Sequence, residues 1–363
     1  MPQPADLPRA LAELKPKAKE PASASMLTSW INQIEKQVGS LGGRLGWLFS
    51  STVVVAVLQR ALDVDGQPHF LLKGGTLLQH RLPAAPTRAT KDVDGLIRGD
   101  IEEFLVKLDD VLDEPWGPLS FRRSAVEVID TPTRVIKPRR FDVVVEMRGK
   151  TWRKIQVEIA PDEGGAGQAP EPFPAPTLAP IGLPDPDALV GLALRYQVAQ
   201  KIHACSDPHE PPASVNDRAR DVVDLLLLRE LAEIGDEPAA VRAAVVDIFD
   251  ARARDAQTLG RAARTWPCVV VAHPHWPDDY ERAASEAQLS LTLEQAVAEL
   301  NTWLSLIDAA APTGVDVDVD VDVDVDDVDD EDDDDEDEHD DDEDEHDDEH
   351  DDEHDDEHDE NSQ

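Results

Sequence analysis

Two aspartates separated by one residue, Asp92 and Asp94, are the part of the sequence best suited to chemistry. They open an apolar run that predicts a strand, and alternate residues of a strand point to the same side of its sheet. Two carboxylates on one side repel each other unless a positive charge lies between them. A divalent cation meets this need, because Mg²⁺ binds one or two carboxylates and completes its shell with water and substrate phosphates. The spacing therefore indicates a cation site on this strand.

A pair of glycines, Gly74 and Gly75, follows a short apolar run at residues 70–72 that predicts a buried strand. Glycine has no Cβ, so a phosphate can approach the backbone N–H groups of such a turn. A lone D-x-D or a lone G-G turn would be weak, because each is usually a solvated strand or turn. A phosphate-binding turn beside a cation site is the outline of a site that transfers a nucleotide.

The two features together resemble the first motif of the nucleotidyl transferase AbiEii/AbiGii toxin family, within the polymerase-β-like superfamily. In that family a strand leads into a K-G-G-T-like turn, and R-x-[ST]-x-D-[IV]-D follows. The matching residues here are Lys73, Gly74, Gly75, Thr76, Arg88, Thr90, Asp92 and Asp94. The resemblance implies that the turn, Arg88 and Thr90 bind the nucleotide, and that Asp92 and Asp94 are catalytic and hold the metal.

Two-metal transfer uses a third carboxylate, because two ions about 3.5–4 Å apart stabilise the attacking and leaving oxygens. The superfamily takes it from a strand after the D-x-D pair. We place this metal ligand at Glu158, on the polar side of a predicted strand at residues 152–159, although relatives more often have aspartate. The alternatives are Asp142 on the preceding strand, and a solvated Glu158 that only pairs with Lys154.

A second match to the family begins at Lys201 and continues with Asp221 and Asp224, which are neighbours on one face of a predicted helix. It resembles the family's helical lysine and its later K/R-D-x-x-D motif. The resemblance implies that Lys201 and Asp221 are catalytic. Lys201 would hold the triphosphate, and Asp221 would orient that lysine or activate the attacking hydroxyl. The alternative is a helix surface with ion pairs to Arg218 and Arg220.

The elements that must position these residues follow from apolar periodicity. Helices are predicted at residues 25–38, 46–62, 100–112, 185–205, 214–231, 237–249 and 293–307, and further strands at 121–129 and 140–147. The proline- and glycine-rich residues 161–185 predict a loop. The resemblance implies an α+β fold, with a mixed-sheet nucleotidyltransferase domain at 25–165 and a helical domain at 185–310. Residues 1–24 are predicted to be a flexible arm.

The acidic charge of the chain is concentrated at its end. The 34 acidic residues from Val315 onward, with no Lys or Arg, supply most of the formal charge of −44, so the remainder carries about −10. Alternating V-D would normally indicate a strand, but unpaired carboxylates repel one another and predict a disordered Asp/Glu/His tail at 315–363. The role of this tail stays open.

Two cysteines without metal-ligand spacing are typical of a reducing cytoplasm. The longest apolar run, around residues 53–58, is much shorter than the roughly 18 residues of a membrane helix. We therefore expect a cytoplasmic protein with no membrane segment.

The expected activity, by resemblance, is transfer of a nucleotide from an NTP to a hydroxyl with Mg²⁺ or Mn²⁺, by the toxin of a type IV toxin–antitoxin or abortive-infection system. A tRNA 3′ end or another RNA is an expected acceptor, and a cognate antitoxin an expected partner. A non-catalytic binding protein, or a transferase that modifies a small molecule or a protein, are the alternatives. An RNA end could be guided by basic residues, or these could form an ordinary solvent face: Lys137, Arg139, Arg140, Arg148, Lys150, Arg153 and Lys154.

Overall fold

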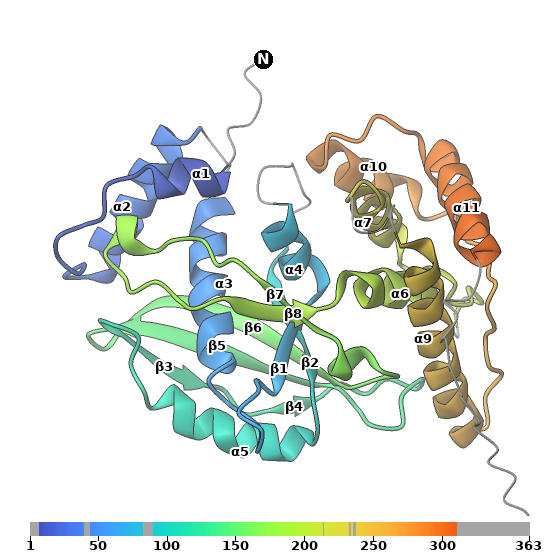
Figure 1. The fold of residues 1–363 in the computed structure, drawn as a ribbon, viewed down its shortest axis with the longest axis horizontal. Coiled ribbons are helices and arrows are strands. Elements are labelled where there is room, and N and C mark those ends of the chain that lie inside the picture. Colours follow the sequence, from blue (N-terminus) through green and yellow to red (C-terminus); the bar gives the residue numbers. More distant parts are fainter. Residues whose placement is uncertain are drawn as a thin grey trace, which may run out of the picture. The chain divides into compact units, whose positions relative to one another are not determined.

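A mixed sheet with the strand order β3-β5-β6-β2-β1-β8-β7 is the centre of the protein, and β4 pairs with β5 (Figure 1). The computed structural model describes residues 7–39, 44–82, 90–212, 214–231, 234 and 237–310. The predictions for Arg88 and for the tail at residues 315–363 lie outside the described residues. The strands are β1 (Phe70–Lys73), β2 (Asp92–Ile97), β3 (Leu119–Arg123), β4 (Glu127–Val128), β5 (Arg139–Met147), β6 (Lys150–Pro161), β7 (Pro170–Phe173) and β8 (Leu189–Leu192).

The pairing of the strands is antiparallel at β1–β2 and β5–β6, and parallel at β2–β6 and β1–β8. The predicted hairpin between β5 and β6 is present, and its turn residues Arg148 and Gly149 have φ angles of 51° and 75°. Positive φ at both central residues is the geometry that continues the right-handed twist of the two strands. This hairpin brings two long strands beside β2.

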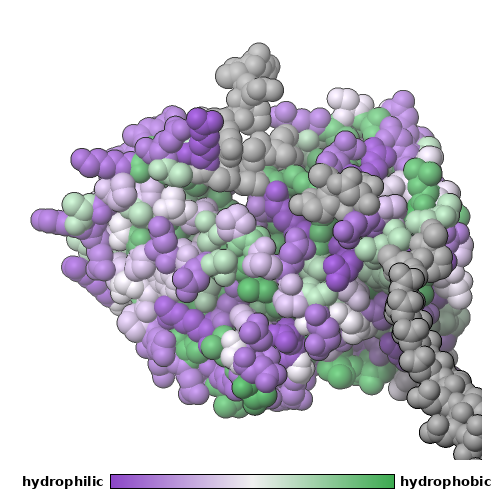
Figure 2. Space-filling view, in the orientation of Figure 1, coloured by the Kyte–Doolittle hydropathy of each residue, from purple (hydrophilic) through white to green (hydrophobic). Residues whose placement is uncertain are grey.

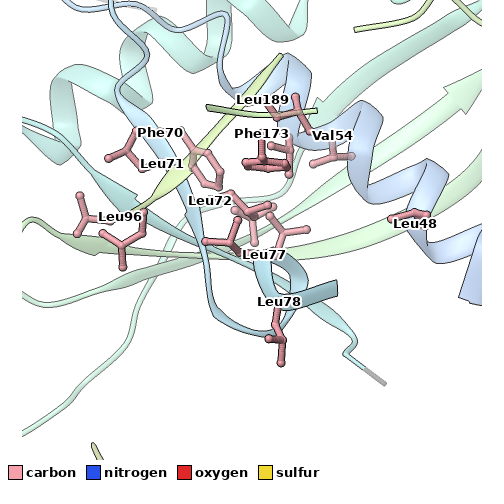
Figure 3. Close-up of a cluster of buried hydrophobic side chains, with 14 of the residues drawn as sticks. Leu48, Val54, Phe70, Leu71, Leu72, Leu77, Leu78, Leu96, Phe173 and Leu189 are labelled. Carbon is pink, nitrogen blue, oxygen red and sulfur yellow. The ribbon is translucent and has the colours of Figure 1, made fainter. Parts of the chain in front are cut away.

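One side of the sheet carries the apolar side chains of Val93, Val157 and Phe141, which are register partners on neighbouring strands. Helices α2 (Ala24–Gln37), α3 (Arg44–Leu58) and α5 (Ile101–Leu112) pack beside the strands. Phe70 of β1 stacks on Phe104 of α5, with ring centroids 6.4 Å apart. Figure 3 shows the core around β1, to which α3, α4 (Gly74–Arg81), β7 and β8 also contribute side chains.

The helical part that follows the sheet consists, in the described ranges, of α6 (Leu194–Cys205), α7 (Ala219–Arg229), α9 (Pro238–Thr258), α10 (Pro277–Glu286) and α11 (Leu293–Ala309). Helix α6 packs against α7 and α9, and α7 packs against α10 and α11. A mixed sheet followed by a helical part is the α+β fold that the sequence predicts. The described residues give no test of the domain boundaries at 25–165 and 185–310, which remain predictions.

The segment between β6 and α6 differs from its prediction. Residues 161–185 hold β7 and two short 3-10 helices (Ala166–Gln168 and Ala179–Ile181), and β8 occupies part of the predicted helix. Helix α6 therefore begins only at Leu194. Prolines are tolerated in β7 because it is an edge strand, and Gly191 of β8 lies so close to Leu77 that a Cβ would come within 2.8 Å of its Cδ1. These features depend on the partner strand and are not visible in the local sequence.

Helix α10 lies where the sequence predicts a loop. It has proline at its start and two acidic residues, Asp278 and Asp279, in its first turn. Both features favour a helix N-terminus. Only Tyr280, Ala283 and Ala284 are buried, so the helix has a narrow apolar side that periodicity alone did not reveal.

The N-terminal residues of the described part contact the rest of the protein. Helix α1 (Leu7–Ala12) buries Leu7 and Leu11 in the core. The backbone N–H of Lys17 donates to the carbonyl of Ala179 at 3.0 Å.

On the face shown in Figure 2, hydrophilic and hydrophobic residues are interspersed. None of the helices in the described ranges combines the length and the apolar character that crossing a bilayer requires.

Candidate active site

Four charged side chains from four adjacent strands form a row across one side of the sheet. Lys73 of β1 is the register partner of Asp94 on β2, and Asp94 is the partner of Glu158 on β6. Glu158 is in turn the partner of Arg140 on β5. Register partners point to the same side of a sheet. The row therefore places two carboxylates side by side, with a cation at each end.

The surroundings of the Asp94 carboxyl group disfavour its negative charge. Burial is the largest cause that raises its pKa, to about 6, and the negative charges of Asp92 and Glu158 add to the effect. The cations of Lys73 and Lys201 oppose it. The other aspartate is oriented locally, because the hydroxyl of Thr90 donates to Asp92 Oδ1 at 2.9 Å. A buried carboxylate whose charge is disfavoured by two neighbouring carboxylates forms a suitable environment for a cation.

The glycine turn lies directly against Asp94. Gly74 follows β1 with φ +67°, and a Cβ there would lie 2.1 Å from Asp94 Oδ2. Gly75 is buried in the first turn of α4. The hydroxyl of Thr76 donates to the backbone carbonyl of Asp92 at 2.8 Å. The turn and the two aspartates are thus joined as one unit, although 16 residues separate Thr76 from Asp92 in the chain.

Alanine at position 74 is expected to reduce nucleotide transfer by at least about tenfold, because its methyl group would displace the Asp94 carboxylate. The strain of a positive φ adds about 1 kcal/mol of destabilisation. Gly149→Ala is the matched control, since Gly149 has φ +75° and open space around its Cα. Equal activity in the two alanine variants would show that the contact between Gly74 and Asp94 has no catalytic importance.

Lys201 of α6 is held by two aspartates of α7. Its ammonium donates to Asp221 Oδ1 at 2.6 Å and to Asp224 Oδ2 at 2.7 Å. One turn earlier on α6, the amide of Gln197 donates to the carbonyl of Gly74 at 3.1 Å. Lys201 therefore lies beside the glycine turn, and its charge is among those that lower the pKa of Asp94.

The two candidates for the third carboxylate occupy different positions. Glu158 adjoins Asp94 and accepts hydrogen bonds from Arg140 Nε at 2.9 Å and Gln156 Nε2 at 3.0 Å. Asp142 pairs with Lys154 at 2.9 Å, and strand β6 separates it from β2. Two strand spacings amount to about 10 Å, so Glu158 is the better placed of the two. Within the described ranges, no group of three or more Asp, Glu, His or Cys side chains is arranged closely enough to hold a metal ion.

A cavity of about 760 Å³ opens in front of the row. Lys73, Asp94 and Glu158 line one side of it. The rest is lined by the loop after β4, by α6 and the loop between α6 and α7, and by α9 and the loop that follows it. These contribute five arginines, which the sequence analysis did not identify as site residues: Arg134, Arg218, Arg252, Arg261 and Arg264.

The basic residues proposed from the sequence to guide RNA do not form one patch at the site. Arg148 and Lys150 lie at the hairpin turn, seven residues along β5 from Arg140, which corresponds to about 25 Å. Nearer the site, several of these residues are ion-paired, among them Arg139 with Glu102, Arg140 with Glu158 and Lys154 with Asp142. The cationic surface of the cavity is instead the set of arginines above.

The family model "Nucleotidyl transferase AbiEii toxin, Type IV TA system" matches residues 56–304, so the chain belongs to this family. It is therefore a nucleotidyltransferase, and a toxin of a type IV toxin–antitoxin system. A search of curated proteins gave no match. Among solved structures, MenT4, a nucleotidyltransferase toxin from Mycobacterium tuberculosis H37Rv, is 16% identical with a TM-score of 0.37, and the alignment covers 78% of this chain and 99% of that one.

Proposed function

We propose that the protein transfers a nucleotide from an NTP to a hydroxyl acceptor, in a reaction that requires Mg²⁺ or Mn²⁺. The observation that carries this proposal is the cavity in which Asp94 and Glu158 face a wall of arginines. Its volume lies within the range of about 300–1,000 Å³ that is usual for small-molecule sites. A metal-bound nucleoside triphosphate matches such a cavity, because its cation suits the carboxylates and its phosphates suit the arginines.

Asp92, Asp94 and Glu158 are the residues that would hold the divalent cations. They fit this role because Asp92 and Glu158 both raise the pKa of Asp94, a repulsion that a bound cation would relieve. When bound, the cations supply neutralisation of the negative charge on the phosphate oxygens. Glu158 would exchange its contacts with Arg140 and Gln156 for this role.

The remaining residues bind and orient the nucleotide. The Gly74–Gly75 turn lets phosphate oxygens approach the backbone at the start of α4, where N–H groups have no intrahelical partner. Lys73 and Lys201 both place positive charge near Asp94, and Asp221 orients Lys201 through their 2.6 Å hydrogen bond. The acceptor hydroxyl gives up its proton to solvent and its oxygen bonds to the α-phosphorus. The bond from that phosphorus to the bridging oxygen breaks, and pyrophosphate leaves with the electron pair of that bond.

Transfer can be tested with NTPs labelled at the α-phosphate and offered with total RNA, protein or metabolites from the same cells. We expect the label to enter RNA at 3′ ends, with tRNA as the expected acceptor, and a chelator to abolish the transfer. Label in protein or in small molecules would instead identify those as acceptors.

Asp92→Ala and Asp94→Ala are each expected to lower transfer at least about 10³-fold, because each removes a metal ligand. Both should also abolish growth inhibition when the protein is expressed. The control is Asp110→Ala, an exposed residue of α5 on the other side of the sheet from the row. Growth inhibition that persists in both site variants would contradict the proposal.

Membership of a type IV toxin family also leads us to propose a cognate antitoxin as partner, encoded by a neighbouring gene. Because NTPs and tRNA are the proposed substrates, we place the activity in the cytoplasm. Coexpression with the neighbouring gene should restore growth, and a failure of every neighbouring gene to do so would contradict this assignment.

A further inference from the structure

Two of the arginines in the cavity are fixed by a single buried carboxylate. Arg134, from the loop between β4 and β5, lies 2.7 Å from Glu163 Oε2 through one guanidinium nitrogen. Arg252 of α9 forms an ion pair with the same carboxylate. Gln200 of α6 donates to Glu163 Oε1 at 2.6 Å. The side chain of Glu163 is only 3% exposed, so it acts as an internal anchor for both cations.

Lys73 brings a third cation to this region. Its pKa is lowered by burial, raised by the negative charges of Glu163 and Asp94, and lowered again by Arg134 and Arg252. These mutual effects place Lys73, Arg134 and Arg252 in one electrostatic neighbourhood. The pKa of Arg252 is also lowered, first by burial and then by Arg134. The cluster is therefore a desolvated site where several positive charges meet.

Positive charge exceeds negative charge on this side of the cavity. Arg264 is balanced by Asp207 at 2.6 Å, and Arg134 has a second, longer contact of 3.6 Å with Asp255. Arg261 donates to the backbone carbonyl of Pro132 at 3.0 Å, which carries no net charge. Buried charges are stable when they are paired. Arg134 and Arg252 share the one buried carboxylate of Glu163, which also acts on Lys73, and this sharing favours the binding of an anion.

The chemistry of the anion follows from the two sides of the cavity, with arginines on one and the carboxylates of Asp94 and Glu158 on the other. Guanidinium groups held in fixed orientation recognise phosphate oxygens through pairs of parallel N–H bonds. Glu158 and Asp94 on the sheet side repel an anion unless cations accompany it. In a chain of linked phosphates with divalent cations at one end, the phosphates complement the arginines and the cations complement the carboxylates.

We propose that Arg134 and Arg252, positioned by Glu163, bind the terminal phosphates of the nucleotide, which places the α-phosphate beside Asp94. This inference rests on the proposed function and adds the residues that bind the leaving pyrophosphate. Arg134 is only 6% exposed, so it can bind a small ligand inside the cavity more readily than the backbone of a long RNA.

The direct test is calorimetric binding of inorganic triphosphate with Mg²⁺ to the full chain. Arg252→Gln is expected to weaken binding at least tenfold, and Arg254→Gln to leave it unchanged, because Arg254 lies two residues along the same helix but is exposed and outside the cavity lining. The loss in Arg252→Gln should be largest for NTP, smaller for NDP and absent for NMP. A merely structural role for Arg252 would weaken all three ligands equally.

Arg261→Gln is the second variant, should loss of Arg252 prevent folding. Arg261 is exposed and lines the same cavity, so its removal should weaken triphosphate binding several-fold without affecting the Tm. Equal triphosphate affinity in wild type, Arg252→Gln and Arg261→Gln would overturn the inference, as would loss of RNA binding with triphosphate binding intact. Normal triphosphate binding without any transfer would count against the proposed function alone.

Discussion

Replacing Asp94 by asparagine should abolish transfer and at the same time make the protein more stable at neutral pH. Asparagine has nearly the same shape but carries no charge, so it should bind the proposed cation much more weakly. Because the pKa of Asp94 is raised from 3.8 to about 6, the folded state binds this proton more tightly than the unfolded state does. Stability therefore falls as the pH rises from about 4 to about 6, and the loss is complete above pH 6.

The gain in Asp94→Asn should follow the opposite course. It should be fully present above pH 6 and should disappear below pH 4, where Asp94 is neutral in both states. A shift of about two pKa units corresponds to about 3 kcal/mol, and partial exposure of the side chain reduces this to about 1–2 kcal/mol.

Urea unfolding of both proteins without divalent cations, at pH 4 and pH 7.5, measures this gain. Asp110→Asn, on the exposed side of α5, is the control and should show no such difference. An Asp94→Asn protein that is less stable than wild type at pH 7.5 would mean that the carboxylate is held mainly by Lys73 and Lys201. A gain in stability together with lost activity is the usual result where function requires charges that the fold alone would not favour.

The first motif could be predicted from sequence because its geometry is local. Strand alternation around Val93 places Asp92 and Asp94 together, and a G-G pair after an apolar run gives a turn. What the sequence does not contain is the register between strands. Glu158 was predicted as a metal ligand, with a pair to Lys154 as the alternative, but residues four apart on a strand are separated by about 13 Å. Antiparallel pairing with β5 places Arg140 opposite Glu158 instead.

The arginines of the cavity could not be predicted for a related reason. Arg134 lies in a loop, Arg252 in the middle of α9 and Glu163 after β6, so 118 positions separate the two cations in the chain. No spacing rule connects them. Only the packing of α9 against α6, and of α6 against the glycine turn, brings them to the same cavity. The same dependence on distant partners explains why β7 and β8 were predicted as loop and helix.

Lys201→Ala is expected to have the largest effect on stability of any change considered for this protein. The side chain of Asp224 is fully buried and that of Asp221 is 12% exposed, and both accept a hydrogen bond from Lys201. Without the lysine, two buried carboxylates would face each other. Breaking a buried ion pair in this way typically costs about 3–5 kcal/mol. This is a large part of the free energy of unfolding of a domain, which is about 5–15 kcal/mol.

A double-mutant cycle separates this structural role from a catalytic one. Lys201→Ala combined with Asp224→Ala should be more stable than the sum of the single changes predicts, by at least about 1 kcal/mol, because the more deeply buried of the two carboxylates is gone as well. Lys201→Arg keeps the charge but has a planar fork in place of a compact ammonium, so it should recover part of the stability. If Lys201 also contacts the nucleotide, the Arg variant should fold yet remain poorly active. Full activity in a folded Lys201→Arg protein would restrict Lys201 to holding α6 against α7, and would leave the phosphates to the glycine turn and the arginines.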